Sequence, residues 1–221
     1  MTRPTGAHEG TAGGAPSSGQ RRAHTVSPSS LLRRPILWSQ IFLVGFLALS
    51  ISLHPGFVFK GDEGGISNYG IHLRTAIPYT LAFALGALFT LGAAGRRPFP
   101  GVARIGLLVY AVLLLLTLVS TYVYTLDEGL KLVHVGVAVV LVCFEALASP
   151  WMYLRVMGRG AAALLAVVIV GFVVAGVTFM GAAHLLFVGQ ALTTLGFAGL
   201  LIRTEPALDG DSAGATGVPG R

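Results

Sequence analysis

The 221-residue chain has little charge and almost no cysteine. Only 11% of its residues are charged, whereas 54% are hydrophobic, and its mean hydropathy is +0.77. A soluble domain carries about 25% charged residues, so this composition excludes an ordinary soluble protein and indicates a membrane protein. The single cysteine, Cys143, excludes both a disulfide framework and a thiolate metal cluster.

Common enzyme motifs are also missing. The sequence contains no Walker A loop, no GxSxG nucleophile elbow, no HExxH zinc motif and no GxGxxG after a strand. Its apolar runs contain no paired carboxylates. These absences make an enzyme the less favoured class of function.

What the chain does have is six apolar runs of about 19 to 22 residues, each long enough to cross a hydrocarbon core of about 30 Å as a helix. They cover residues 36–54, 76–95, 104–125, 131–149, 161–180 and 183–202. We therefore expect an all-α integral membrane protein with six transmembrane helices in a domain spanning 35–203. The last two runs are separated only around Gly181, which predicts a tight helical hairpin. Residues 1–34 and 204–221 are rich in small and polar residues, so we expect disordered tails there.

The basic residues predict the orientation of these helices. A six-span chain puts twelve of the fifteen Lys and Arg residues on the side of the two termini, and only Lys60, Arg74 and Lys131 on the other side. By the positive-inside rule, both termini are cytoplasmic and the protein lies in the cell membrane. The net charge of +6 is thus a topology signal. No basic patch with interleaved aromatic residues accompanies it, so we expect no nucleic-acid partner.

This topology brings four histidines to the outer end of the bundle, namely His54, His72, His134 and His184. Neutral imidazole is a common zinc ligand, so these residues are the candidate metal site, and zinc is the cofactor that such a site would hold. Asp62, Glu63 or Asp127 would then act as the base of a metal-dependent hydrolase acting on lipids. The alternative is that each histidine is only an amphipathic side chain at the membrane interface, in which case no cofactor is expected.

The first outer connection contains the stretch GDEGGISNYGIHLRTAIPY, residues 61–79. Its glycines permit tight turns, and Arg is well suited to phosphate. The candidate ligand-binding residues are Ser67, Asn68, Tyr69, His72, Arg74 and Tyr79. An ordered connector without a ligand is the alternative. We expect this loop to be structured and to contact lipid headgroups.

Glu145 is the one carboxylate within an apolar run. An ionisable group in a transmembrane segment points to a functional site, and a transporter would use it as the coupling residue. Its position near the cytoplasmic end favours a structural role, with an ion pair to Arg97, Arg104 or Arg155. In the last run Gln190 and Thr194 are four residues apart, a pattern typical of hydrogen bonding between membrane helices.

The stretch GGISNYGIHLRTAIPYTLAF resembles the first-loop signature of the six-helix Frag/DRAM/Sfk-type membrane proteins and of bacterial relatives grouped as domain of unknown function family 998. The residues that match are Ile66, Ser67, Gly70 and Pro78. The start of the last span, HLLFVGQALTTLGF, is similar to the final helix of that superfamily. Asn68 and Tyr69 stand where those proteins tend to have an acidic residue, and Gln190 also replaces an expected carboxylate. The resemblance implies lipid handling or support of another membrane protein.

These observations predict a multi-pass membrane protein that binds or organises a lipid, another amphiphile or a membrane protein partner at the outer leaflet. A metal-dependent membrane hydrolase is the second hypothesis and a transporter the third.

Overall fold

The computed structural model describes residues 34–58, 65–96, 99–124, 128–181 and 185–215. Within these ranges every regular element is a helix. The six long helices are α2 (Pro35–Leu53), α4 (Leu73–Ala94), α5 (Gly101–Tyr124), α6 (Lys131–Val156), α7 (Arg159–Phe179) and α8 (Leu186–Ala215).

Each long helix coincides with one of the expected apolar runs, so the all-α prediction with six spans is confirmed. Two helices extend well beyond the C-terminal ends of the expected runs. α6 continues through Pro150 to Val156, and α8 continues through Pro206 to Ala215. In α8 this extension matters, because Thr204, Glu205 and Leu208 are buried. The expected end of the helical domain at residue 203 is therefore too early.

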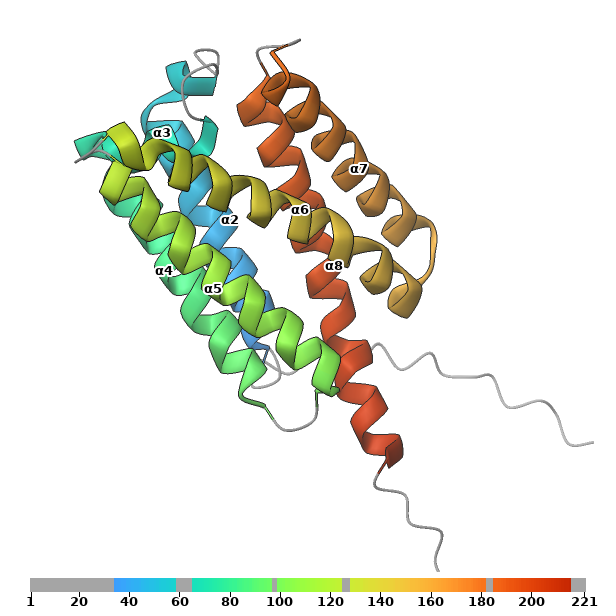
Figure 1. Ribbon diagram of the computed structural model, residues 1–221. Coiled ribbons are helices and arrows are strands. Elements are labelled where there is room, and N and C mark those ends of the chain that lie inside the picture. Colours follow the sequence, from blue (N-terminus) through green and yellow to red (C-terminus); the bar gives the residue numbers. More distant parts are fainter. Residues whose placement is uncertain (1–33, 59–64, 97–98, 125–127, 182–184, 216–221) are drawn as a thin grey trace, which may run out of the picture.

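Four short helices occupy the connections. η1 (Pro55–Val58), η2 (Gly65–Ser67) and α3 (Asn68–Ile71) lie between α2 and α4, and η3 (Glu128–Leu130) precedes α6. We call the end of the bundle that carries these short helices the α3 end. The opposite end, where α2 begins and α8 finishes, is called the terminal end (Figure 1).

The long helices form two groups with α6 between them. α2, α4 and α5 pack side by side, α7 packs chiefly against α8, and α6 contacts α5, α7 and α8. Figure 1 shows α6 crossing obliquely between the two groups.

Small residues bring helices of the same group close together. A β-carbon on Gly189 of α8 would lie 2.5 Å from the backbone nitrogen of Ala175 in α7, and one on Gly171 would lie 2.5 Å from the nitrogen of Thr193. In the other group, the Ser39 hydroxyl of α2 donates to the carbonyl of Gly86 in α4 at 2.8 Å. Close approach through glycine is typical of membrane helix pairs, and it confirms the expected hairpin.

Glu205 joins the two groups at the terminal end. Its carboxylate accepts hydrogen bonds from the backbone N–H groups of Ile36 and Leu37 at 3.1 and 3.2 Å, and from Nε of Arg34 at 3.2 Å. The first N–H groups of a helix have no partner within the helix, so Glu205 of α8 caps the start of α2. The carboxylate also compensates the positive end of the α2 dipole.

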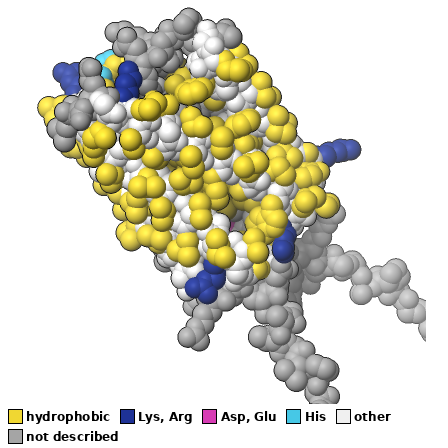
Figure 2. Space-filling view, viewed as in Figure 1, with side chains coloured by type: hydrophobic (Ala, Val, Ile, Leu, Met, Phe, Trp, Pro, Cys, Tyr) yellow, Lys and Arg dark blue, Asp and Glu magenta, His cyan; other side chains and the backbone are white. Residues whose placement is uncertain are grey.

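The surface of the bundle suits a lipid environment. All six long helices are long and apolar enough to cross a membrane. Figure 2 shows hydrophobic side chains over the visible face, with Lys and Arg near its two ends and at its margin. Leu73, Ile77, Leu132, Leu147 and Met180 are among the large apolar side chains left exposed. The chain is a multi-pass membrane protein.

Candidate functional site

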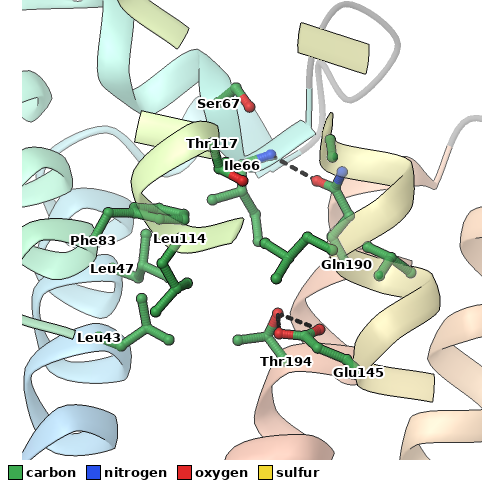
Figure 3. Close-up of a pocket in the computed structure, with 13 residues that line it drawn as sticks. Leu43, Leu47, Ile66, Ser67, Phe83, Leu114, Thr117, Glu145, Gln190 and Thr194 are labelled. Carbon is green, nitrogen blue, oxygen red and sulfur yellow. Dashed lines mark hydrogen bonds between the residues drawn. The ribbon is translucent and has the colours of Figure 1, made fainter. Parts of the chain in front are cut away.

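The segment from Gly65 to Ile71 turns inward and enters the α3 end of the bundle. The backbone N–H of Ile66 donates to Oε1 of Gln190 in α8 at 3.0 Å, and the Ile66 side chain points into the bundle (Figure 3). Gly65 has a φ of 57°, and a β-carbon at this position would collide with Oε1 of Gln190. Glycine is therefore required here both by the backbone conformation and by the close contact with α8.

A serine–histidine–serine chain fixes the same segment to α5 and α6. His134 of α6 is 6% exposed. Its Nε2 is 2.8 Å from Oγ of Ser67, and its Nδ1 is 2.9 Å from Oγ of Ser120 in α5. A hydroxyl can donate or accept, so a neutral imidazole satisfies both contacts with one N–H and one lone pair. Because His134 is buried, a ring nitrogen that lost its serine partner would be left without a hydrogen bond, and this would cost free energy.

Tyr69 and Tyr79 are fully buried and hold α3 against its neighbours. The Tyr69 hydroxyl donates to the carbonyl of His54 at 3.4 Å, and the Tyr79 hydroxyl is 2.9 Å from Oγ1 of Thr121. Burial raises the pKa of the Tyr69 phenol above its ordinary value, so this hydroxyl keeps its proton. The Thr75 hydroxyl donates to the carbonyl of Tyr69 at 2.6 Å. These two tyrosines are thus buried structural contacts rather than surface groups.

The remaining candidate ligand residues lie on the outside of the α3 end. His72 and Arg74 are exposed and Asn68 is half-buried. The His72 ring packs against Phe57, with ring centroids 4.3 Å apart, and Phe57 in turn stacks on His54 at 3.9 Å. The structure therefore separates the expected ligand-binding set into a buried group, which includes Ser67, and an exposed group.

The four expected metal ligands are divided in the same way. The rings of His54 and His72 lie 6.1 Å apart at the α3 end, while both nitrogens of His134 contact serines. His184 lies outside the described residues, as do Asp62, Glu63 and Asp127. In the described part of the chain, no three His, Cys, Asp or Glu side chains come together as a metal site. Zinc binding stays a prediction.

An apolar groove of about 200 Å³ lies between α6, α7 and α8 in the half of the bundle near the α3 end. Its apolar walls include Val139 of α6 with Phe172, Gly176 and Phe179 of α7. Val139, Phe172 and Phe179 are 40%, 39% and 63% exposed, so the groove opens on the lipid-facing surface. Three polar side chains line it, namely Ser67, His134 and Gln190. We call this space the lateral groove.

A smaller cavity of about 40 Å³ lies next to the lateral groove, deeper in the bundle. Ser67, Ala138, Val142 and Gln190 line both spaces, so they form the boundary between them. Figure 3 shows the inner cavity with Leu43, Leu47, Phe83 and Leu114 on one side and Gln190, Thr194 and Glu145 on the other. We call it the Glu145 chamber.

Glu145 does not have the environment expected from the sequence. It is 1% exposed, and both of its carboxylate oxygens lie near the Thr194 hydroxyl of α8, at 3.2 and 3.4 Å. Glu145 forms no ion pair with Arg104 or Arg155, the salt bridge among the described residues is Arg34–Glu205, and the third expected partner, Arg97, lies outside the described residues. The expectation is wrong because the face of α6 that carries Glu145 is directed toward α8 and the bundle interior.

Sequence reasoning missed several residues that build this region. Ser120 and Thr121 of α5 are polar residues in an apolar run. The local sequence does not indicate that Ser120 contacts His134, which is 14 residues away. Gln190 was expected to hydrogen-bond between helices, and it does bond across the bundle, but to the backbone of η2. The Gly65-Ile66 pair was the available signal, since a glycine beside an apolar residue in a polar loop indicates a close approach.

Comparison of the chain with protein-family models, with curated proteins and with solved structures gives no significant match. The resemblance to the Frag/DRAM/Sfk-type proteins therefore remains a prediction from four residues. Functional inference rests on the geometry of the lateral groove and of the Glu145 chamber.

Proposed function

We propose that the protein binds a membrane amphiphile at the outer leaflet. The hydrocarbon part of the ligand lies in the lateral groove, and its polar group lies at Ser67 and Gln190. The observation that carries this proposal is a groove that opens toward lipid along apolar walls and ends at polar side chains, of which Ser67 and His134 are buried and Gln190 is half-buried. That distribution matches a molecule with one apolar and one polar part.

The size of the groove supports an organic occupant. An apolar cavity of about 150 Å³ accommodates benzene, and the lateral groove has about 200 Å³. Its lining side chains sit on helices that cross the membrane, so hydrocarbon chains are the molecules present at its mouth. Asn68, His72 and Arg74 lie at the same end of the bundle, where they would contact the headgroup layer. Lys131 begins α6 one turn before His134 and adds a second exposed cation there.

The proposal is tested by filling the groove. A β-carbon on Gly176 meets no heavy atom within 4 Å, and Gly176 lines the groove, so Gly176→Leu places a side chain in the space without a backbone clash. Gly136 of α6 is equally open and lines neither the groove nor the chamber, so Gly136→Leu is the matched control.

Native mass spectrometry of the detergent-purified variants provides the measurement. We expect wild type and Gly136→Leu to retain a bound amphiphile, and Gly176→Leu to lose it. Equal retention by all three proteins would contradict the proposal, as would the absence of any bound amphiphile in wild type after addition of membrane lipids.

A further inference from the structure

Glu145 differs from the other buried acidic side chain in the described part of the chain. Glu205 has a cation and two backbone N–H donors around it. Glu145 is equally buried, at 1% exposure, but its hydrogen bonds are shared with one neutral hydroxyl, that of Thr194. An ionised carboxylate without a cationic partner is costly in a membrane interior. Protonation of the carboxylate or pairing with a bound cation removes this cost, and the carboxylate oxygens can accept further hydrogen bonds from such a cation.

The chamber provides room for a group that would satisfy it. About 15 Å³ of free space suffices for one water molecule, and the chamber has about 40 Å³. The side chains with oxygen atoms that line it are those of Ser67, Thr117, Glu145, Gln190 and Thr194, and its other lining side chains are apolar. A small cationic group fits this volume, and the carboxylate and hydroxyl oxygens are acceptors for its N–H groups.

The connection between the spaces indicates where the rest of such a molecule lies. The chamber and the lateral groove share Ser67, Ala138, Val142 and Gln190. Among the described residues that line either space, no Lys or Arg is present. The described residues that line the two spaces therefore supply no Lys or Arg cation to Glu145, and the groove is the space that adjoins the chamber.

We propose that the Glu145 chamber binds the protonated amino group of an amphiphilic amine whose hydrocarbon part occupies the lateral groove. This inference rests on the proposed function and specifies the class of ligand. The ammonium group forms a charge-assisted hydrogen bond with Glu145, which is stronger than a bond between neutral groups, and it uses Thr194 as a further acceptor. A neutral alcohol of the same chain length enters the groove but leaves the carboxylate without a counter-charge.

The test compares dodecylamine with dodecan-1-ol, which share a hydrocarbon chain and differ in the polar group. Binding of each to the full-length protein in detergent near neutral pH is measured for wild type, Glu145→Gln and Gly176→Leu. Glu145→Gln keeps the shape of the side chain and removes its charge. Comparison between variants cancels the partition of each ligand into detergent micelles.

In wild type we expect dodecylamine to bind about tenfold more tightly than dodecan-1-ol. Glu145→Gln loses this preference and keeps its affinity for the alcohol, which also shows that the variant is folded. Thr194→Val retains the charge of Glu145 but removes the hydroxyl acceptor, so we expect it to lower the preference for dodecylamine only in part.

Two outcomes would overturn the inference. One is equal affinity of wild type for the two ligands, which would mean that the chamber does not recognise the charge. The other is a preference for the amine that Glu145→Gln leaves unchanged, which would place the ammonium group elsewhere. Gly176→Leu separates these failures from failure of the proposed function: it weakens both ligands if the groove binds amphiphiles, and neither if it does not.

Discussion

At the scale of single residues, the α3 end depends on hydrogen bonds that cross between distant parts of the chain. His134 contacts Ser67 and Ser120, and Gln190 accepts from the N–H of Ile66. Each of these groups lies where water has little access. A buried group left without its partner costs more than the bond itself contributes, so single substitutions here have measurable effects.

Ser67→Ala removes one acceptor or donor from buried His134. We expect it to lower the free energy of unfolding by about 1–2 kcal/mol. Ser52→Ala is the control, because Ser52 is exposed and its hydroxyl bonds only to the carbonyl of Ala48 in its own helix. Thermal unfolding in detergent provides the comparison, and equal midpoints for the two variants would show that the Ser67–His134 contact does not stabilise the bundle.

Gly65→Ala introduces a β-carbon at a positive φ and against Gln190. We expect a loss of about 1–2 kcal/mol in the free energy of unfolding, since alanine is strained at φ above zero. Gln190→Ala relieves the collision but not the backbone strain.

The loss of stability in the double variant Gly65→Ala/Gln190→Ala should therefore be smaller than the sum of the losses in the two single variants, as measured by a double-mutant cycle. Strict additivity would mean that Gly65 and Gln190 do not interact.

At the scale of helices, two contacts stabilise the bundle: one joins the two helix groups, and the other lies within one group. The first is Glu205, which caps α2 from α8. Glu205→Ala should lower the free energy of unfolding by about 1–2 kcal/mol, since it removes the cap and the partner of Arg34. Glu205→Gln retains one oxygen acceptor, so we expect an intermediate value in chemical denaturation. A fully stable Glu205→Ala variant would contradict the assigned role.

The second contact is the α7–α8 interface, where Gly189 lies against the backbone of Ala175. Gly189→Val requires the helices to separate, and overpacking of this kind typically costs about 1–3 kcal/mol. Gly136→Val is a suitable control because its β-carbon meets open space. If the two variants unfold at the same temperature, the close packing of α7 on α8 is not a source of stability.

The helices themselves were predictable from the sequence, but their facing directions were not. Apolar runs identify spans because the hydrocarbon core imposes their length. Helix α6 is apolar on most of its circumference, so hydropathy does not tell which face meets α8, and Glu145 was expected to reach an arginine at the interface. Similarly, the last apolar run ends at residue 202, whereas the buried Leu208 shows that packing continues beyond it.

The candidate site was predictable only in part for a related reason. The segment 61–79 was identified from its glycines and polar residues, and Ser67 does lie at the lateral groove. The contact of Ile66 with Gln190 joins residues 124 positions apart. Contacts at this separation depend on how the two helix groups are placed relative to each other, and local sequence carries no signal for that.

At the scale of the whole molecule, the charges predict how the bundle sits in the membrane. The positive-inside rule assigns the terminal end of the bundle, where α2 begins and α8 finishes, to the cytoplasm. We expect single cysteines introduced at residues 20 and 215, in a Cys143→Ala background, to resist a membrane-impermeant maleimide in intact cells and to react after lysis. Reaction in intact cells would reverse the proposed orientation and place the lateral groove at the cytoplasmic leaflet.

Photo-crosslinking shows whether an amphiphile occupies the lateral groove. Full-length protein is irradiated with an amphiphile that carries a diazirine on its hydrocarbon chain, and the adducts are mapped by peptide mass spectrometry. We expect adducts concentrated on α6 and α7 around Val139, Phe172 and Phe179, lost in Gly176→Leu and retained in Gly136→Leu. Adducts spread evenly over exposed apolar residues such as Leu88 of α4, and unchanged by Gly176→Leu, would contradict it.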